Sequence, residues 1–357
     1  MVRLADQSEF RFREGEAPAT NDASFLWGSL RSFTPRRDWL TIDWFRAKIV
    51  TDQKRAYDHE SYPHIGAPGG PADEFDNPYC RSIALQWATR LGKTFFGQAA
   101  VIRTADTDPA QMLFVSANEK LAIEVTKRTY KMLRARAELA GLLLKGEADQ
   151  KQDLIEFHEC EMFVGWARSA ATLADKNIKV GHANELDEWE HPSTSKDGDP
   201  QELFTDRFKA YQSHRKVIFE SVPKVRGVSR IEALRKQGTN CRLSVPCPKC
   251  KRYQTLEFGT GLPYGVKWEK DENDNHTLEL ASRTAHYICR HCAKKIDDHD
   301  RPWMIRRGVW CPEGAEVIDK IALKITEHEL RRPISGKRSY EWSGWKSAPW
   351  IKGRAVR

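Results

Sequence analysis

The 357-residue sequence lacks the two features that would direct a chain into or across a membrane. It contains no run of 18 apolar residues, so we expect no membrane-spanning helix. Its first residues, MVRLADQSEFRFREGEAP, are charged throughout and do not form the apolar segment of a secretory signal peptide. These absences favour a protein that acts inside a cell and has no membrane partner.

Charge is distributed unevenly along the chain, whose formal net charge is +8. From Asp206 to Arg252 there are 13 lysines and arginines against 3 acidic residues. From Glu185 to Asp206 there are 8 acidic residues and 1 lysine. A basic stretch of this kind favours a nucleic-acid partner, with a solvated basic face as the alternative of equal weight.

The segment from Ser82 to Ala100 has the pattern of a phosphate-binding loop. A short apolar strand, Ile83 to Leu85, precedes a turn with Gly92-Lys93-Thr94 and then an amphipathic helix. Backbone N–H groups at a helix N-terminus bind anions. Lys93 would reach the β- and γ-phosphates of a nucleotide, and the Thr94 hydroxyl would hold Mg²⁺. The first glycine of the consensus is missing, because Trp87 stands there, so an ordinary helix start with an exposed lysine is the alternative.

Strands alternate with helices around this motif, which favours an α/β domain with a largely parallel sheet flanked by helices. Asn118 is a suitable N-cap for a long helix over Glu119–Leu144. The other expected elements are two helices between Phe25 and Tyr57, a loop over Ser61–Pro78, and strands at 112–115, 154–158, 162–166, 178–183 and 216–222.

Two further segments carry candidate chemistry. Asp187 and Glu188 follow a strand, where a P-loop NTPase keeps an aspartate for Mg²⁺ and a carboxylate that activates water. An acidic surface turn is the alternative. The apolar strand before Ser221 ends in a small hydroxyl residue, which could sense the γ-phosphate, although a plain buried strand would look the same.

The cysteine spacing indicates a metal site. Cys247-Pro248-Lys249-Cys250 and Cys289-Arg290-His291-Cys292 are two C-x-x-C pairs, and four thiolates so arranged predict one structural tetrahedral Zn²⁺. The separation implies a zinc-ribbon-like β insertion, and a redox role is the minor alternative. Cys241 and Cys311 lie nearby as possible substitute ligands, whereas Cys80 and Cys160 are expected to be core thiols.

In this order the motifs resemble the large terminase subunit of tailed phages, of the lambda gpA type. The residues that carry the resemblance are Ala88–Thr94, Leu186-Asp187-Glu188, Ser221-Val222-Pro223 and the paired cysteines, with Gly308-Val309-Trp310 beyond them. The resemblance implies a RecA/ASCE-like ATPase fold and explains the missing glycine. It further implies that Arg90 holds or senses the γ-phosphate within the nucleotide-binding residues Arg90, Leu91, Gly92, Lys93 and Thr94, and that Ser221 belongs to a coupling motif.

The same resemblance implies an ATP-driven motor that packages double-stranded DNA. Its expected cofactors are ATP, Mg²⁺ and Zn²⁺. Its expected partners are DNA, a small terminase subunit, the portal of a procapsid and further copies of itself, in the cytoplasm of a host cell. The alternatives are a helicase-like ATPase, although no second set of strand-gripping motifs is found, and a zinc-ribbon DNA-binding protein with a degenerate ATPase.

The expected domain organisation has four parts. Residues 1–24 form a loose N-terminus, 25–236 the ATPase domain, 237–312 the zinc-binding subdomain, and 313–357 a basic, Trp-rich tail. Large terminases carry a C-terminal nuclease that needs several converging carboxylates. The 45 residues after Pro312 are too few for such a domain, so we expect this tail to be the truncated start of the nuclease and expect no DNA cleavage.

Overall fold

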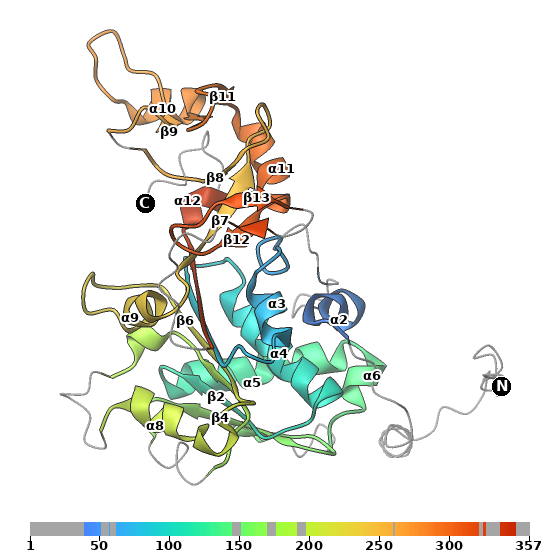
Figure 1. The fold of residues 1–357 in the computed structure, drawn as a ribbon. Helices are drawn as coiled ribbons and strands as arrows, with labels where there is room; N and C mark the ends of the chain where they lie inside the picture. Colours follow the sequence, from blue (N-terminus) through green and yellow to red (C-terminus); the bar gives the residue numbers. More distant parts are fainter. Residues whose placement is uncertain are drawn as a thin grey trace, which may run out of the picture.

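The computed structural model describes residues 39–50, 57, 62–144, 151–169, 176–190, 198–259, 261–320, 324–325 and 336–347. Its core is one large sheet with helices on both faces (Figure 1). Within these ranges no helix has the length and apolar character needed to span a bilayer. The expected helical region before residue 39 and the loose N-terminus lie outside the described residues.

The main sheet has ten strands in the order β12-β7-β15-β1-β6-β5-β2-β4-β3, with β8 paired to β7. Seven neighbouring strands, from β7 to β4 in that order, run parallel, and β12, β8 and β3 are antiparallel additions. The strands are β1 (Ser82–Trp87), β2 (Met112–Ser116), β3 (Leu154–Glu156), β4 (Glu161–Trp166), β5 (Val180–Ala183), β6 (Lys216–Ser221), β7 (Cys241–Pro246), β8 (Tyr253–Thr255), β12 (Val309–Cys311) and β15 (Lys337–Trp342).

Helices cover both faces of this sheet. The longer helices and short turns are α2 (Thr41–Lys48), α3 (Pro71–Asp76), α4 (Lys93–Thr107), α5 (Glu119–Arg134), α6 (Ala137–Ala140), η2 (Leu186–Glu188), α8 (Pro200–Asp206), η3 (Lys209–Tyr211), α9 (Arg230–Gln237), η4 (Asp298–Asp300), α11 (Arg301–Arg306) and α12 (Gly344–Ser347). Helices α4 and α5 pack on one face, whereas α8 and α9 pack on the other (Figure 1). A parallel sheet covered in this way is buried on both faces.

Alternate residues of each central strand serve the two cores. In β1, Ile83 and Leu85 pack with α4 while Ala84 belongs to the opposite core. In β2, Phe114 belongs to the core on the α4 side and Val115 belongs to the opposite core. Because successive side chains of a strand point to opposite faces, an unbroken apolar run is what a doubly covered strand requires.

The strand order brings distant segments together at one edge of the sheet. Strand β6 lies between β1 and β5 and runs parallel to both, so the carboxyl ends of all three strands meet. The turn after β1, the residues after β5 and the last residues of β6 therefore lie side by side. In open α/β sheets, ligands bind at such a carboxyl edge.

The cysteine-containing region continues from the main sheet into a smaller one. A three-stranded antiparallel sheet has the order β11-β10-β9, and Figure 1 places it beyond the end of β7 and β8, away from α4 and α5. Its elements are β9 (Gly265–Lys267), α10 (Leu278–Thr284), β10 (His286–Ile288) and β11 (Lys295–Ile296), and a separate two-stranded ribbon is formed by β13 (Val317–Asp319) and β14 (Lys324–Ile325).

The sheet does not follow the expected domain boundaries. Lys337–Trp342, expected in a tail beyond the ATPase domain, forms β15, which pairs in parallel with β1 over its whole length. Tyr340 and Trp342 are fully buried there. Strands β7 and β12, expected in the zinc-binding subdomain, also belong to the main sheet. These three strands therefore join the main sheet across the expected boundaries, because β15 pairs with β1, β7 pairs with β15, and β12 pairs with β7.

Two local expectations also need correction. The helix expected over Glu119–Leu144 divides into α5 and α6, because Arg136 adopts an extended conformation between them. The loop expected over Ser61–Pro78 contains the helix α3, which begins at Pro71. Proline is favoured in the first turn of a helix, where its missing N–H is not needed.

Candidate nucleotide-binding site

The turn between β1 and α4 has the backbone shape of an anion-binding loop. Arg90 and Gly92 both have left-handed φ angles, of 63° and 78°. This conformation suits glycine and strains arginine. A Cβ on Gly92 would lie 2.8 Å from a ring carbon of Tyr62, so a glycine is also required by space. Because α4 starts directly at Lys93, its first backbone N–H groups are directed toward this turn, as in anion sites at helix N-termini.

Trp87 accounts for the missing consensus glycine. It is the last residue of β1 and is fully buried. Its ring stacks on that of Trp310 in β12, with 6.1 Å between the ring centroids. A glycine there would remove one of the largest core side chains and leave a cavity. The turn therefore consists of residues 88–92 alone, with the strand continuing through Trp87.

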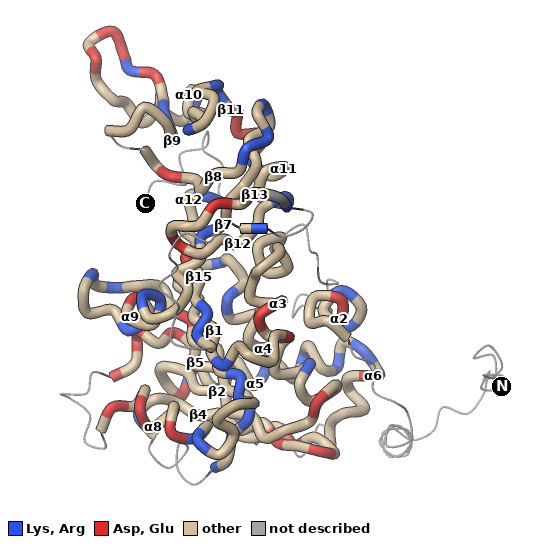
Figure 2. The backbone as a smooth tube through the Cα atoms, in the orientation of Figure 1, with Lys and Arg blue, Asp and Glu red and all other residues tan. Residues whose placement is uncertain are grey.

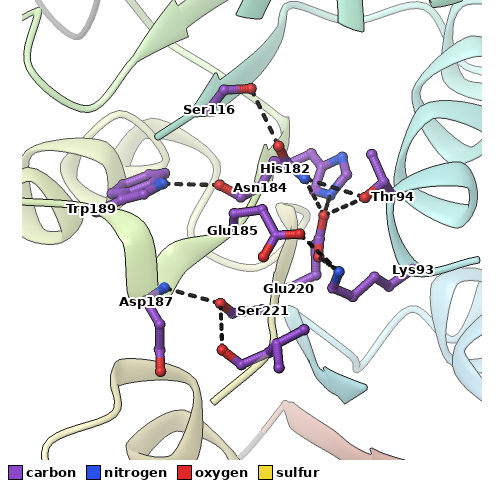
Figure 3. Close-up of polar contacts among 11 residues, drawn as sticks. Lys93, Thr94, Ser116, His182, Asn184, Glu185, Asp187, Trp189, Glu220 and Ser221 are labelled. Carbon is purple, nitrogen blue, oxygen red and sulfur yellow. Dashed lines mark hydrogen bonds and ion pairs between the residues drawn. The ribbon is translucent and has the colours of Figure 1, made fainter. Parts of the chain in front are cut away.

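Lys93 is a buried lysine between two carboxylates. Its Nζ lies 2.9 Å from Oε1 of Glu185 and 3.3 Å from Oε2 of Glu220 (Figure 3). Burial acts to lower the pKa of Lys93, but the negative charges of Glu220 and Glu185 outweigh it and raise that pKa. The ammonium is therefore charged at neutral pH and stands where the phosphates of a nucleotide would approach the loop.

Glu220, near the end of β6, is the most deeply buried acid of the site. It has no exposed surface, and its Oε1 accepts a hydrogen bond from the Thr94 hydroxyl at 2.8 Å. The amide of Asn184 donates a second hydrogen bond to the same oxygen (Figure 3). Burial acts to raise the pKa of Glu220, but His182, whose Nε2 is 3.7 Å away, and Lys93 outweigh it and lower that pKa. Glu220 is therefore a charged carboxylate.

Asn184 and Glu185 follow β5 directly and complete the buried site. Glu185 has a left-handed φ of 51°, and its carboxylate is directed at Lys93 (Figure 3). Strain of this kind at a non-glycine residue is typical of functional sites. Asn184 Nδ2 lies 3.3 Å from the Thr94 hydroxyl, and its Oδ1 accepts a hydrogen bond from Ser116 at 3.4 Å.

Asp187 and Glu188 have other partners. The carboxylate of Asp187 accepts hydrogen bonds from the backbone N–H of Lys224 at 3.1 Å and of Ile231 at 2.9 Å. Glu188 Oε2 is 2.5 Å from Lys224 Nζ, and its side chain is 45% exposed. Both acids therefore bind the segment after β6 and the start of α9. These contacts do not support the predicted roles of Asp187 in holding Mg²⁺ and of Glu188 in activating water.

The remaining predicted residues lie around the same edge. Ser221 Oγ accepts a hydrogen bond from the Asp187 N–H at 3.1 Å (Figure 3). The carbonyl oxygen of Leu91 is 2.8 Å from Nε2 of His64, which supports the turn from behind. The Arg90 side chain is exposed at the tip of the turn. The sequence therefore located the loop and the strand that ends at Ser221, while their chemical roles remain predictions.

Sequence reasoning missed Glu185 and Glu220. Glu185 comes two residues after the end of β5, whereas the sequence prediction falls on Asp187 and Glu188, because two adjacent acids match the expected pair. A signal was available, since the first acid after a buried strand is the one nearest its carboxyl end. Glu220 is a charged residue that directly follows the apolar run Val217–Phe219, and this isolated charge in a strand is the signal that it needs a buried partner.

The four predicted cysteines converge at the far end of β7. Their Sγ atoms all lie within 4.8 Å of one another. The Cys247–Cys292 and Cys250–Cys289 pairs have Sγ–Sγ distances of 3.9 Å. In each C-x-x-C turn a backbone N–H donates a hydrogen bond to the first sulfur. Lys249 donates to Cys247 and His291 donates to Cys289, both at 3.4 Å. Two such knuckles present the sulfur ligands of a tetrahedral Zn²⁺ site.

The thiol chemistry of this cluster fits a cation. Burial raises the pKa of Cys247 to about 12, whereas a hydrogen bond from the Lys294 backbone lowers the pKa of Cys292. Four sulfurs this close repel one another once deprotonated, and a divalent cation removes that repulsion and favours the thiolates. The donor set therefore fits zinc.

Cys241 and Cys311 are not members of the cluster, which among the described residues contains only the four paired cysteines. They lie on the neighbouring antiparallel strands β7 and β12. Burial raises the pKa of Cys241 to about 12 and that of Cys311 to about 11, so both are neutral core thiols. Cys80 and Cys160 are buried, as expected.

A parallel sheet with a phosphate loop after β1, a buried lysine at the start of α4 and acids at the ends of the adjacent strands defines a P-loop NTPase. Comparison with known proteins specifies the family. Residues 53–310, more than half of the chain, match the family model described as "Phage terminase large subunit gpA, ATPase domain". The chain therefore belongs to this family of phage terminase large subunits.

One relative and two solved structures are similar to parts of this chain. The terminase large subunit of Enterobacteria phage P21 is 29% identical over 310 residues, which are 83% of this chain and 46% of that protein. The chain thus spans less than half the length of this relative. The large terminase of bacteriophage HK97 is 12% identical with a TM-score of 0.42, over 56% of this chain and 40% of that one. The large terminase ATPase domain of Thermus phage P74-26 is 12% identical with a TM-score of 0.37, over 49% and 72%.

Proposed function

We propose that this chain hydrolyses ATP to drive double-stranded DNA into a phage procapsid. The observation that carries the proposal is the position of Lys93, a buried and charged lysine at the start of α4, where the turn after β1 offers an anion site. In P-loop NTPases a lysine at this place binds the β- and γ-phosphates. Family membership supports ATP as the nucleotide.

Each residue of the loop has a role in this proposal. Lys93 exchanges its contacts with Glu185 and Glu220 for the phosphates of ATP. Thr94 offers its hydroxyl oxygen to Mg²⁺, which, when bound, neutralises charge on the β- and γ-phosphates. Arg90, exposed on the turn, reaches the γ-phosphate from the solvent side. Preorganised cations of this kind stabilise the transition state of phosphoryl transfer.

We assign the activation of water to Glu185 in place of Glu188. Glu185 contacts Lys93 at 2.9 Å and is therefore within one side chain of the phosphates that Lys93 would bind. Once Lys93 turns to the phosphates, the carboxylate of Glu185 is released and can accept a proton from the attacking water. Glu188 is paired with Lys224 at 2.5 Å in the loop after β6.

The segment of residues 222–229 provides a path from this site to DNA. It follows Ser221 directly, and the backbone N–H of Lys224 within it donates a hydrogen bond to Asp187 in the turn η2 after β5. Lysine and arginine gather on it and on α9 (Figure 2). Val225 and Val228 are 60% and 73% exposed, so the segment stands out from the sheet. We propose that it contacts the phosphates of DNA and moves when the γ-phosphate is lost.

Family membership supports the partners in this proposal, and the cysteine cluster supports the metal. The four cysteines hold one structural Zn²⁺ that folds the region around β9, β10 and β11. The partners are a small terminase subunit, the portal of the procapsid and further copies of this chain, assembled in the cytoplasm of the host cell. We assign no DNA cleavage to the described residues, so plasmid incubated with this chain and Mg²⁺ or Mn²⁺ should remain intact.

Phosphate release from ATP by the purified chain tests the proposal, with and without double-stranded DNA. A motor should hydrolyse ATP with Mg²⁺ and respond to DNA of any sequence, because contacts to the backbone carry no sequence information. Binding should weaken by about 0.9 log unit per log unit of salt for each phosphate contacted. The absence of hydrolysis under all conditions would favour the alternative of a zinc-containing DNA-binding protein with a degenerate ATPase. Duplex unwinding would favour the helicase-like alternative.

A further inference from the structure

The end of β5 carries an amide where a P-loop NTPase needs a charge. In that class Mg²⁺ is held by the serine or threonine of the loop and by an aspartate at a nearby strand end. Asn184 follows β5 directly and lies 3.3 Å from the Thr94 hydroxyl, so its position matches that aspartate. An amide has no charge, although Mg²⁺ is commonly bound through carboxylates.

The neighbouring strand supplies a carboxylate at the same level of the sheet. Strands β5 and β6 are parallel, and Ala183 pairs with Phe219, so Asn184 and Glu220 are the next residues along the two strands. Glu220 Oε1 is 2.8 Å from the Thr94 hydroxyl, which is closer than the Asn184 amide. Its Oε2 is fully buried and accepts no hydrogen bond within the described part of the chain.

The charge balance of the site changes when nucleotide binds. One ammonium, that of Lys93, faces the carboxylates of Glu185 and Glu220. If Lys93 turns to the phosphates, Glu220 loses its ammonium partner and keeps His182, at 3.7 Å, as a neighbour, while remaining fully buried. An uncompensated buried carboxylate is unfavourable unless another cation replaces the first. A cation beside Thr94 would lie next to Glu220.

We propose that Glu220 supplies the carboxylate of the Mg²⁺ site, directly or through one ordered water, in place of the aspartate that Asn184 replaces. This inference rests on the proposed ATPase function and extends it. Asn184 then acts as a positioning residue, since its amide donates a hydrogen bond to Glu220. A purely structural role, in which Glu220 only holds Lys93 and Thr94 in place, is the competing explanation.

Mg²⁺ titrations of nucleotide binding separate these two roles. The full 357-residue chain would be titrated with Mg²⁺ at a fixed concentration of a fluorescent ATP analogue, with EDTA as the zero point. For Glu220→Gln we expect the Mg²⁺ concentration at half saturation to rise by about 10- to 100-fold, the usual effect of losing a group that supports a bound metal. Binding in EDTA should be unchanged or tighter, because a negative charge beside the phosphates is removed.

Two further variants make the test specific. Glu188→Gln is the matched control, since it also removes a carboxylate paired with a lysine, and it should keep the wild-type Mg²⁺ requirement. Asn184→Asp combined with Glu220→Gln moves the carboxylate from β6 to β5. It should restore half saturation to within about threefold of the wild-type value, because a charge again lies next to Thr94.

The outcomes are distinguishable. If the wild-type chain binds no nucleotide, the proposed function itself fails. If wild-type binding depends on Mg²⁺ and Glu220→Gln has the same requirement, only the present inference is overturned. Equal weakening of Glu220→Gln with Mg²⁺ and with EDTA also overturns it, in favour of the structural role. If Glu220→Gln fails to fold, the double variant provides the test. Nucleotide binding by the double variant that does not depend on Mg²⁺ contradicts the inference, whereas the same Mg²⁺ requirement as in the wild-type chain supports it.

Discussion

The four-cysteine cluster and the nucleotide site are assembled in opposite ways. The cluster consists of two turns, each contributing two sulfurs three residues apart in sequence, at the end of β7 and after β10. The nucleotide site takes its groups from the start of α4 and from the ends of β5 and β6, up to 126 residues apart. Each half of the cysteine cluster is therefore formed by residues close in sequence, whereas the nucleotide site exists only once the sheet has formed.

Their charges differ as well. The nucleotide site contains its own cation, because Lys93 balances Glu185 and Glu220 before any ligand arrives. The cluster has four sulfurs within 4.8 Å and no cation among its members. We therefore expect the cluster to need a bound metal for stability, and the nucleotide site to be stable before a ligand binds. The predictions below test this difference.

Removal of zinc should have the largest effect. Structural zinc contributes on the order of 10–16 kcal/mol to small zinc-binding peptides. Chelation, or Cys250→Ser, should therefore unfold the region around β9, β10 and β11, while the main sheet remains folded. Metal analysis should find one zinc per chain, and hydrogen exchange should localise the loss of protection. Cys311→Ser is the control, because Cys311 lies outside the cluster. If the region around β9, β10 and β11 is folded without a bound metal, the proposed difference between the cysteine cluster and the nucleotide site is wrong.

Lys93→Ala should be the most damaging change in the nucleotide site. It leaves Glu185 and Glu220 without their cation, and breaking a buried pair in this way costs about 3–5 kcal/mol. The affinity for ATP should fall by more than about 100-fold, because the cation that contacts the phosphates is lost. This fall corresponds to more than about 2.8 kcal/mol of binding free energy. Isothermal titration and chemical denaturation measure the two effects. A variant with wild-type affinity for ATP would remove Lys93 from the site.

A pair of matched substitutions distinguishes the two acidic segments. Glu185→Gln should bind ATP normally but hydrolyse it about 10²- to 10⁴-fold more slowly, the usual contribution of a general base. Glu188→Gln removes an exposed ion pair, for which effects of about 0–1 kcal/mol are typical, and should keep nearly full activity. Single-turnover phosphate release measures both. Slow hydrolysis by Glu188→Gln together with nearly full activity of Glu185→Gln would show that Glu188 activates the water.

Asp187→Ala should produce the smallest effect. The variant loses the acceptors for the backbone N–H groups of Lys224 and Ile231, and hydrogen bonds to charged groups contribute about 1.5–3 kcal/mol each, less where solvent can replace them. We expect the free energy of unfolding to fall by about 1–2 kcal/mol, with ATP affinity unchanged. Urea denaturation and nucleotide titration check the two parts. A large loss of Mg²⁺-dependent binding would place Asp187 at the metal after all.

The same contrast explains what could be predicted from the sequence. A C-x-x-C turn is a local structure, so the convergence of Cys247, Cys250, Cys289 and Cys292 follows from spacing. The phosphate loop is also local, and its strand, turn and helix were placed correctly around Lys93. The partners of Lys93 depend on where β5 ends and on which strand lies beside it. The sequence marks Glu185 and Glu220 as acids near strand ends, but it does not show that β6 lies beside β5, so their contacts with Lys93 could not be predicted from it.

The fold class was predictable for a similar reason. Alternating strands and helices indicate a parallel sheet whatever the order of its strands. The position of β15 was not predictable, because its basic residues at Lys337 and Arg338 dominate the composition, while burial of Tyr340 and Trp342 determines where it pairs. Arg338 keeps its charge in this position through an ion pair with Glu74 at 3.0 Å.

The place of β15 has a consequence for how the chain folds. In the finished sheet β1 is flanked by β6 and β15, and Ser82 pairs with Lys337 near the other end of the sequence. During synthesis one edge of β1 therefore stays unpaired until β15, at Lys337–Trp342, has left the ribosome. Such long-range pairing slows folding and exposes an aggregation-prone strand edge. A nascent chain stopped before Gly336 should consequently depend on chaperones, although its phosphate loop and all four clustered cysteines are already present.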